Sequence, residues 1–337
     1  MGNLGSVVDR PVLEGASPLA QNAAFAGFVR TGATLEMKAF TGVAGDAGGF
    51  AVPREIDAQI DTLLKAVSPI RSIANVVKVG SAGYRKLVTT GGTPSGWAAE
   101  NAARPETASP VFVEIAPPTG ELYANPSASQ AMLDDAALDV EEWLAGEIAM
   151  EFAKAEGAAF VSGSGVSRPK GFLTSATAAT ADGVRAFGTL QYLASGTAGD
   201  FSASPQERLI DLVQSLRGPY RQGASFVMNA ATLARIRKFK TTDGAFVWAP
   251  SLAAGVPATL LGYPVVEAED MPDIAANALA IAFGNFRAGY IIAERTETGI
   301  LRDPYSNKPF VNFYATKRVG GCVTNSEAIK LMKFSVA

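Results

Sequence analysis

The chain has 337 residues, 48% of them hydrophobic and 18% charged, which is typical of a folded protein with length for about two domains. It contains no histidine and one cysteine, Cys322. This composition excludes Ser-His-Asp and Cys-His nucleophiles, histidine metal ligands, an intrachain disulfide and multi-cysteine metal cages. The net charge of −3 provides no overall basic field for holding nucleic acid, and no apolar run is long enough to span a membrane.

The first part of the chain, residues 1–52, is rich in glycine and poor in apolar side chains. Such a segment buries too little apolar surface to offset the entropy of ordering, so we expect an arm that orders against a partner. Four glycines are expected to let this arm follow different paths in different copies: Gly42, Gly45, Gly48 and Gly49. Apolar residues from Ile56 to Val67 recur at helical spacing and predict a helix that ends before Pro69.

Two strand-like runs, residues 84–90 and 111–116, are separated by residues 91–110, which have no periodicity. A connection of that length is uncommon in a compact domain unless it is functional, disordered or extended toward a partner. We therefore predict a long two-stranded hairpin that projects from the body. Its connection contains three residues that suit a contact between subunits: Trp97, Glu100 and Arg104.

The most helical stretch of the sequence spans residues 138–161. Val140, Leu144, Ile148 and Phe152 repeat at four-residue steps and predict the longest helix of the chain, ending at Gly163.

A second region begins at Ser204, where Ser204, Pro205 and Glu207 together predict a capping box at the start of a helix. Asn229 is expected to cap another helix that runs through Phe239. Short strands are predicted around these helices, at 226–228, 245–248, 279–283, 289–294, 300–303, 310–318 and 328–333. This mixture lacks a regular strand–helix–strand rhythm, so the predicted fold class is α+β.

Catalytic and metal-binding motifs are poor. Ser167 and Lys170 fit a Ser-x-x-Lys pattern, but Pro169 argues against the helical turn that this chemistry requires. Glu267, Glu269 and Asp270 form a small acidic cluster, for which solvated loop charges are the favoured interpretation. We therefore predict no enzyme activity, no metal and no cofactor.

A series of short motifs, each weak by itself, follows a characteristic order over residues 48–334. They are Gly48-Gly49-Phe50-Ala51-Val52-Pro53, Trp97-Ala98-Ala99-Glu100, Leu133-Asp134-Asp135, Val140-Glu141-Glu142-Trp143-Leu144, Arg168-Pro169-Lys170-Gly171-Phe172, Phe226-Val227-Met228-Asn229, Leu261-Gly262-Tyr263-Pro264-Val265, Ile281-Ala282-Phe283-Gly284-Asn285-Phe286 and Asp303-Pro304-Tyr305. In this order the sequence resembles the major capsid protein family of tailed double-stranded DNA bacteriophages, the Hong Kong ninety-seven type. That family includes the capsids of phage-derived gene transfer agents.

The resemblance implies an α+β capsid fold built from four parts. They are an N-terminal arm at 1–52, an extended hairpin loop (E-loop) at 80–122, a peripheral (P) domain at 53–79, 123–203 and 309–322 whose spine helix covers about 138–161, and an axial (A) domain at 204–308 and 323–337.

The resemblance also implies the function and the partners. Copies of the chain are expected to form hexamers and pentamers that close into an icosahedral shell around packaged double-stranded DNA. Expected partners are portal and head-completion proteins, with scaffold, protease or decoration proteins as further options, and the DNA by weak non-specific contact. We expect assembly in the bacterial cytoplasm, a final location in the virion or virus-like particle, and no membrane contact.

Some relatives cross-link neighbouring subunits through a lysine, an asparagine and a glutamate. Here the resemblance places Pro309 and Thr316 at the asparagine and glutamate positions, and no lysine lies between Thr89 and Ala124. We therefore expect a shell that is held together without covalent cross-links.

Two alternatives remain open at this stage. An encapsulin-like compartment would use the same kind of subunit to enclose cargo enzymes instead of DNA. A serine hydrolase using Ser167 and Lys170 is the alternative from another class of protein.

Overall fold

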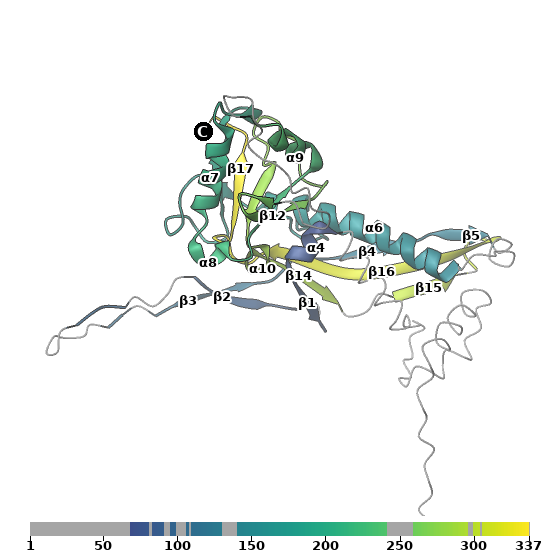
Figure 1. Ribbon diagram of the computed structural model, residues 1–337. Coiled ribbons are helices and arrows are strands. Elements are labelled where there is room, and N and C mark those ends of the chain that lie inside the picture. The colour runs from purple at the N-terminus through teal and green to yellow at the C-terminus, as the bar shows by residue number, and fades with distance from the viewer. Residues whose placement is uncertain are drawn as a thin grey trace, which may run out of the picture.

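The computed structural model describes residues 68–80, 83–90, 95–98, 106–107, 109–129, 140–240, 259–295, 299–303 and 305–336. These residues form two sheets, a long helix and a projecting two-stranded hairpin, a mixed architecture of helix and sheet (Figure 1). The predicted arm at 1–52, the predicted helix from Ile56 to Val67 and the predicted strand at 245–248 lie outside the described residues.

A six-stranded sheet is organised around one long strand, β16 (Phe310–Val323). Antiparallel partners of β16 are β14 (Tyr290–Arg295), β15 (Gly299–Asp303), β4 (Thr119–Ala124) and β5 (Ser127–Ser129), while β1 (Asn75–Val79) runs parallel to β14. The sequence predicted this strand to end at Arg318, but β16 continues for five more residues and includes Gly320 and Gly321. Those glycines serve close packing: a Cβ at Gly321 would lie 2.7 Å from the Tyr290 hydroxyl, and one at Gly320 would lie 2.8 Å from the Pro118 carbonyl oxygen.

The predicted long helix is α6 (Val140–Ser162), which lies along this sheet next to the short helix α4 (Pro69–Ile73) (Figure 1). Leu144, Ile148 and Phe152 are buried, as their spacing predicted. The helix ends at Gly163, where a Cβ would lie within 2.4 Å of the carbonyl oxygens of Pro169 and Ala159. Only glycine fits there, so the chain turns back against the helix.

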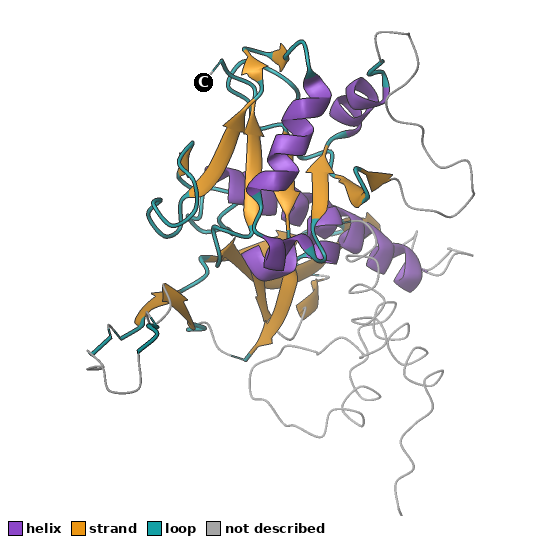
Figure 2. Ribbon diagram, turned by 60° about the vertical axis from the view of Figure 1, so that its left-hand side comes forward, coloured by secondary structure: helices purple, strands orange, loops and turns teal. Residues whose placement is uncertain are grey.

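A seven-stranded sheet forms the second layer, with helices packed around it (Figure 2). Its order is β11 (Thr259–Leu260), β12 (Tyr263–Glu267), β10 (Ser225–Met228), β13 (Ile281–Gly284), β17 (Ile329–Lys333), β7 (Leu190–Ala194) and β6 (Thr177–Ala178). The remaining elements are the helices α7 (Pro205–Ser215), α8 (Gly218–Arg221), α9 (Ala230–Arg237) and α10 (Phe286–Gly289), the 3-10 helix η1 (Phe172–Thr174), and a strand pair, β8 (Gly196–Thr197) with β9 (Asp200–Phe201).

One apolar cluster joins the two sheets. It contains Phe160 from α6, Val319 from β16 and Tyr290 from β14 together with Leu331 from β17. The two layers therefore share a core. A separate cluster lies under α7 and α9, where Leu212 is fully buried.

The two predicted helix caps have different outcomes. Asn229 caps α9 by accepting a hydrogen bond at 2.8 Å from the Thr232 backbone N–H, which confirms the prediction. The predicted capping box at Ser204 is wrong: Ser204 precedes α7, but its hydroxyl makes no capping hydrogen bond. Its φ of −114° and ψ of 72° lie outside the extended conformation that aims an N-cap hydroxyl at the first turn.

Sheet membership cuts across the segments that the resemblance implied. β14 and β15 lie within 204–308 but pair in the six-stranded sheet, whereas β6 and β7 lie within 123–203 but belong to the seven-stranded sheet. The reason is long-range strand pairing, since β15 and β14 both pair with β16 and β7 pairs with β17.

Four buried charged side chains connect the elements of the first layer. Arg71 of α4 contacts Glu156 of α6 at 3.3 Å and makes a short hydrogen bond to Glu294 of β14. Lys317 of β16 lies 3.1 Å from Glu156 and 3.5 Å from Glu294. Two cations and two anions compensate one another, so we call this set the charge quartet. It fixes the helix to the sheet at one register.

Replacement of Glu156 by glutamine is expected to destabilise the fold strongly. The change leaves the buried Arg71 and Lys317 with a single compensating carboxylate, a loss that costs about 3–5 kcal/mol for a broken buried pair. Urea unfolding followed by circular dichroism measures this difference. Glu151→Gln, on the exposed side of the same helix, is the matched control and is expected to unfold like the wild type; equal unfolding of the two variants would contradict the role of the quartet.

The single thiol, Cys322, is buried in β16. Burial raises the pKa of this thiol from an ordinary 9.0 to about 11, and the positive charges of Lys170 and Lys86 lower it by a smaller amount. Only the thiolate reacts, so at pH 8 its native reaction with a disulfide reagent should be about 100-fold slower than in the unfolded chain. A colorimetric thiol assay with and without denaturant checks this. Val166→Cys, at an exposed position, should add one fast-reacting thiol; a fast-reacting Cys322 in the native wild type would contradict the burial.

Candidate functional site

The projecting hairpin is formed by β2 (Lys86–Thr90) and β3 (Val111–Ile115), as the sequence predicted. Among the described residues, the two strands pair with each other and with no further strand, in a sheet separate from the two larger ones. Leu87 lies opposite Glu114, Val88 opposite Val113 and Thr89 opposite Phe112. Apolar side chains therefore occupy both faces of this ribbon.

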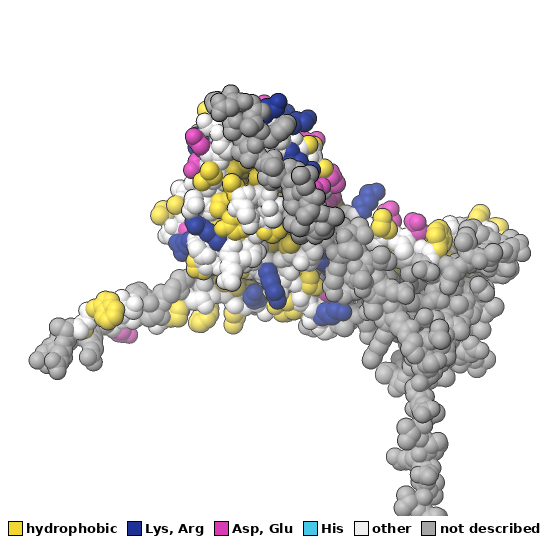
Figure 3. Space-filling view, viewed as in Figure 1, with side chains coloured by type: hydrophobic (Ala, Val, Ile, Leu, Met, Phe, Trp, Pro, Cys, Tyr) yellow, Lys and Arg dark blue, Asp and Glu magenta, His cyan; other side chains and the backbone are white. Residues whose placement is uncertain are grey.

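Three apolar side chains of the ribbon are open to solvent, while Val88 and Val113 are half-buried. Leu87 is 69% exposed, Phe112 63% and Val111 61%. A two-stranded ribbon is marginally stable by itself, and exposed apolar surface on both of its faces indicates an interaction site. Figure 3 shows apolar side chains on the projecting hairpin and along the adjoining lower side of the body.

The three predicted contact residues belong to the connection between these strands. Trp97 is described, and its side chain is fully exposed. Glu100 and Arg104 lie outside the described residues, as do the arm glycines Gly42, Gly45, Gly48 and Gly49. Sequence reasoning selected the tip of the hairpin but missed the apolar side chains of its strands. The sequence signal that could have identified them is the set of apolar residues at 87, 88, 112 and 113, which fall on both faces of a two-stranded ribbon.

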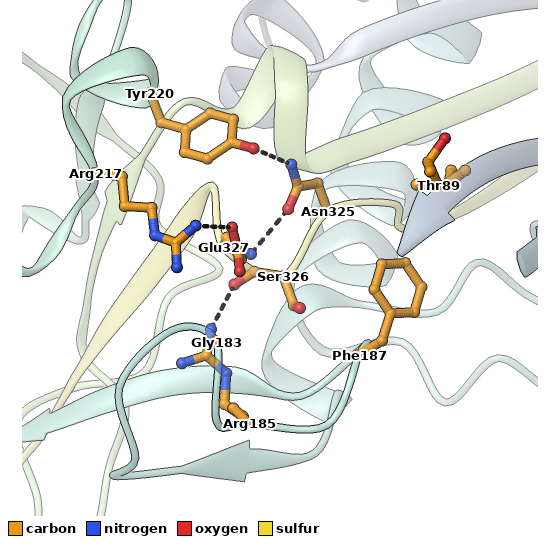
Figure 4. A pocket seen from close by; sticks show the side chains of 10 residues that line it. Thr89, Gly183, Arg185, Phe187, Arg217, Tyr220, Asn325, Ser326 and Glu327 are labelled. Carbon is orange, nitrogen blue, oxygen red and sulfur yellow. Dashed lines mark hydrogen bonds and ion pairs between the residues drawn. The ribbon is translucent and has the colours of Figure 1, made fainter. Parts of the chain in front are cut away.

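A cavity of about 690 Å³ opens where the hairpin leaves the body (Figure 4). One wall is formed by Val88 and Thr89 of β2, and the other by the loop containing Arg185 and Phe187 and by the turn at 325–327. The cavity thus separates β2, where the hairpin joins the body, from the loops of the second layer.

Polar side chains of this cavity are engaged with one another. Arg217 contacts Glu327 at 3.1 Å, and the Tyr220 hydroxyl accepts a hydrogen bond at 2.8 Å from the Asn325 amide. Arg185 donates to the Ser326 carbonyl at 3.3 Å (Figure 4). It also donates to Asp182 at 2.7 Å. These contacts hold the loops in place and pair no nucleophile with a base.

Behind the cavity, Lys330 of β17 is buried and donates to Asp182 at 2.5 Å and to Gln191 at 2.7 Å. Burial lowers the pKa of Lys330, and the hydrogen bond to Asp182 opposes that change. The lysine bridges β17 to the neighbouring loop, which is a structural role.

Ser167 and Lys170 do not form the catalytic pair that the serine-hydrolase alternative requires. Residues 165–168 are bends, and Ser167 has a left-handed backbone with φ of 53°. The Lys170 backbone N–H donates at 2.9 Å to the Gly321 carbonyl, which anchors this loop to β16. Because no helical turn places the lysine beneath the serine, the geometry of Ser-x-x-Lys catalysis is absent.

Among the described residues, no group of three or more acidic, cysteine or histidine side chains is positioned to hold a metal ion. In the part of the chain that the structure describes, no helix is both long and apolar enough to cross a membrane. Of the predicted acidic cluster, Glu267 is the last residue of β12, and Glu269 and Asp270 lie in the turn that follows it. Burial raises the pKa of the Asp270 carboxyl group, and the negative charge of Glu269 raises it further. The Asp270 carboxylate lies close to Gly157 of α6.

The two positions discussed for cross-linking lie on or beside β16. Pro309 directly precedes the strand and is exposed, while Thr316 pairs with Gly299 on one side and Tyr123 on the other.

Comparison with known proteins identifies the family. The model of the phage capsid family matches residues 48–334, most of the chain. None of the curated protein sequences matches.

Solved structures agree with this result. The capsid of a native gene transfer agent (GTA) particle is 54% identical, with a TM-score of 0.74 over 80% of this chain and 90% of that chain. The capsid of an empty GTA particle has the same identity and coverage, with a TM-score of 0.72. A structure from Gordonia phage Cozz shares the fold at 13% identity, with a TM-score of 0.56 over 79% of this chain and 86% of that chain. With a family model that covers most of its length and a capsid relative at this identity, the chain belongs to the phage capsid family.

Proposed function

We propose that this chain is the major capsid protein of a gene transfer agent or closely similar phage head, and that its copies close as hexamers and pentamers into an icosahedral shell around double-stranded DNA. The observation that carries this proposal is the 54% identity to the capsid of a GTA particle over 80% of the chain. That level of identity over that length favours the same assembly role.

The shape of the subunit supports repeated self-contact. A projecting ribbon with apolar side chains on both faces and a fully exposed tryptophan needs a partner surface, and a shell supplies one for every copy. We place Trp97, Glu100 and Arg104 in contacts between subunits. The arm glycines Gly42, Gly45, Gly48 and Gly49 would let identical chains adapt to non-equivalent positions.

In this proposal the layer of the six-stranded sheet and α6 is the peripheral domain, and the layer of the seven-stranded sheet is the axial domain. Strand pairing supports assigning residues 290–303 to the peripheral domain and residues 177–194 to the axial domain. The E-loop is the hairpin of β2 and β3.

A structural role without catalysis is supported by the composition and by the described residues. The chain has no histidine, and the Ser167–Lys170 segment lacks the catalytic turn. Proposed partners besides the chain itself are portal, head-completion, scaffold or decoration proteins. The net charge of −3 favours weak contact with the packaged DNA, and we place synthesis and assembly in the bacterial cytoplasm.

Electron microscopy of particles from producing cells tests the function. We expect closed icosahedral shells that contain nuclease-protected double-stranded DNA. Shells that enclose a co-purifying enzyme and no DNA would instead indicate an encapsulin-like compartment. Monodisperse monomers with a hydrolase activity that is lost in Ser167→Ala would contradict the capsid assignment.

We further propose that the shell is held without covalent cross-links, since Pro309 and Thr316 carry neither the amide nor the carboxylate that such a bond requires. On a denaturing gel of boiled, reduced particles, the capsid chain is expected to run as one band at the mass of a single subunit. A ladder of multimers that resists boiling and reduction would overturn this statement.

A further inference from the structure

The cavity at the root of the hairpin has a surplus of positive charge. Its wall includes Arg185, Arg217 and Glu327, and the ion pair of Lys330 with Asp182 lies directly behind it. Asp182 contacts all three cations, and Glu327 contacts Arg217. Three cations thus share two carboxylates, which leaves one positive charge uncompensated.

Arg217 is the accessible cation of this group. Its side chain is half exposed, whereas the other two cations are buried. Its Nη1 faces Glu327 and its Nε faces Asp182, while its Nη2 has no hydrogen-bond partner among the described residues. On the same side of the cavity, the Tyr220 hydroxyl accepts a hydrogen bond from Asn325, so its own hydrogen is left to donate (Figure 4). A positive charge beside two available donors suits a carboxylate.

Unpaired carboxylates lie near the opposite edge of the same sheet. They belong to Glu267, at the end of β12, and to Glu269 and Asp270 in the turn that follows; we call these three residues the acidic turn. Glu267 and Glu269 are exposed, and none of the three makes an ion pair or a side-chain hydrogen bond with the described part of the chain. The acidic turn therefore has carboxylates that a cation from outside can approach.

The acidic turn cannot reach the cavity of its own chain. In the seven-stranded sheet β12 is next to one edge strand, whereas the cavity lies beside the loop that joins β6 and β7 at the other edge. With about 4.8 Å between neighbouring strands, β12 and β7 are about 19 Å apart. Asp270 also lies against Gly157 of α6, which fixes the turn to the body. The two charged sites are thus held apart within one copy.

A second copy can bring the two sites together. A contact between opposite edges of identical subunits repeats from copy to copy and closes into a ring. The cavity, at about 690 Å³, has room for the side chains of a turn. Its surplus of one positive charge matches one carboxylate and is too small for the several phosphates that a DNA-binding surface contacts. Charge complementarity therefore favours the acidic turn of another copy as the occupant.

We propose that the acidic turn of one copy enters the cavity of a second copy, where Glu269 pairs with Arg217. This inference rests on the proposed shell function and assigns a contact between neighbours within a hexamer or pentamer. Complementary charges across an interface fix the orientation of the partners and suppress wrong contacts more than they add affinity. The pair thereby sets how neighbouring subunits are placed in the ring.

Charge reversal tests the pair in an assembly assay. Arg217→Glu and Glu269→Arg each place like charges in the contact, and each is expected to raise the concentration needed for assembly at least about tenfold. The double variant restores opposite charges across the contact, so its assembly should return close to that of the wild type. The matched control combines Glu269→Arg with Arg208→Glu, which changes an exposed arginine of α7 outside the cavity wall, and no rescue is expected from it.

Unfolding of the free subunits separates folding from assembly. Glu269→Arg removes no ion pair within the described part of the chain, so its free subunit should unfold at the wild-type urea concentration. Single variants that assemble like the wild type, or a folded double variant that assembles no better than Glu269→Arg alone, would overturn the inference and leave the capsid function intact. A wild-type chain that forms no shells would instead contradict the proposed function.

Disulfide trapping is the second measurement, for the case that Arg217→Glu does not fold. In Glu269→Cys/Arg217→Cys shells, mild oxidation should link neighbours around each ring and give a ladder on a non-reducing gel that ends at the hexamer. Glu269→Cys/Val166→Cys is the control, because Val166 is exposed and lies outside the cavity wall. Shells without a ladder, or with the same ladder in the control, would overturn the inference. So would Arg217→Gln shells that assemble normally but lose their DNA, since that result indicates a nucleic-acid site.

Discussion

The body of this subunit depends on four charged side chains that are removed from water together. Arg71, Glu156, Glu294 and Lys317 come from α4, α6, β14 and β16, and each cation contacts both anions. Burying any one of these charges alone would be energetically costly. The four charges compensate one another only when α4, α6, β14 and β16 are packed at one mutual register. The long helix thereby fixes which side of β16 is covered, and the alternation of the strand leaves Phe310 and Tyr314 exposed on the other side.

Stability is therefore divided unequally over the chain. The two sheets and α6 share a continuous apolar core, and the buried Lys330 at its border is paired with Asp182 and Gln191. In the part of the chain that the structure describes, the hairpin of β2 and β3 lacks such support, since its two strands pair with each other alone and Leu87, Val111 and Phe112 are exposed. In the proposed shell, the body would supply its own core and a neighbouring copy would complete the projection, which is the property an assembling shell requires.

Much of the local structure could be predicted from the sequence, because local patterns carry it. The four-residue repeat of Leu144, Ile148 and Phe152 located α6, and Asn229 identified the start of α9. The charge quartet could not be predicted, since Glu156 looks like any helical surface charge until α4 and β16 pack against it. The same holds for Gly321, which reads as a strand end and is required by the Tyr290 hydroxyl. Trp97 was selected as a contact residue, but the ring contact of Tyr123 with Tyr314 depends on the long-range pairing of β4 with β16.

Amide hydrogen exchange, compared between free subunits and assembled shells, tests most directly the claim that the body is complete and the hairpin is not. The amides of α6, β14 and β16 should be protected in both states. Those of β2 and β3 should exchange rapidly in the free subunit and slow by orders of magnitude in the shell, because a neighbour then covers them. A hairpin already protected in the free subunit, or still unprotected in the shell, would contradict this account.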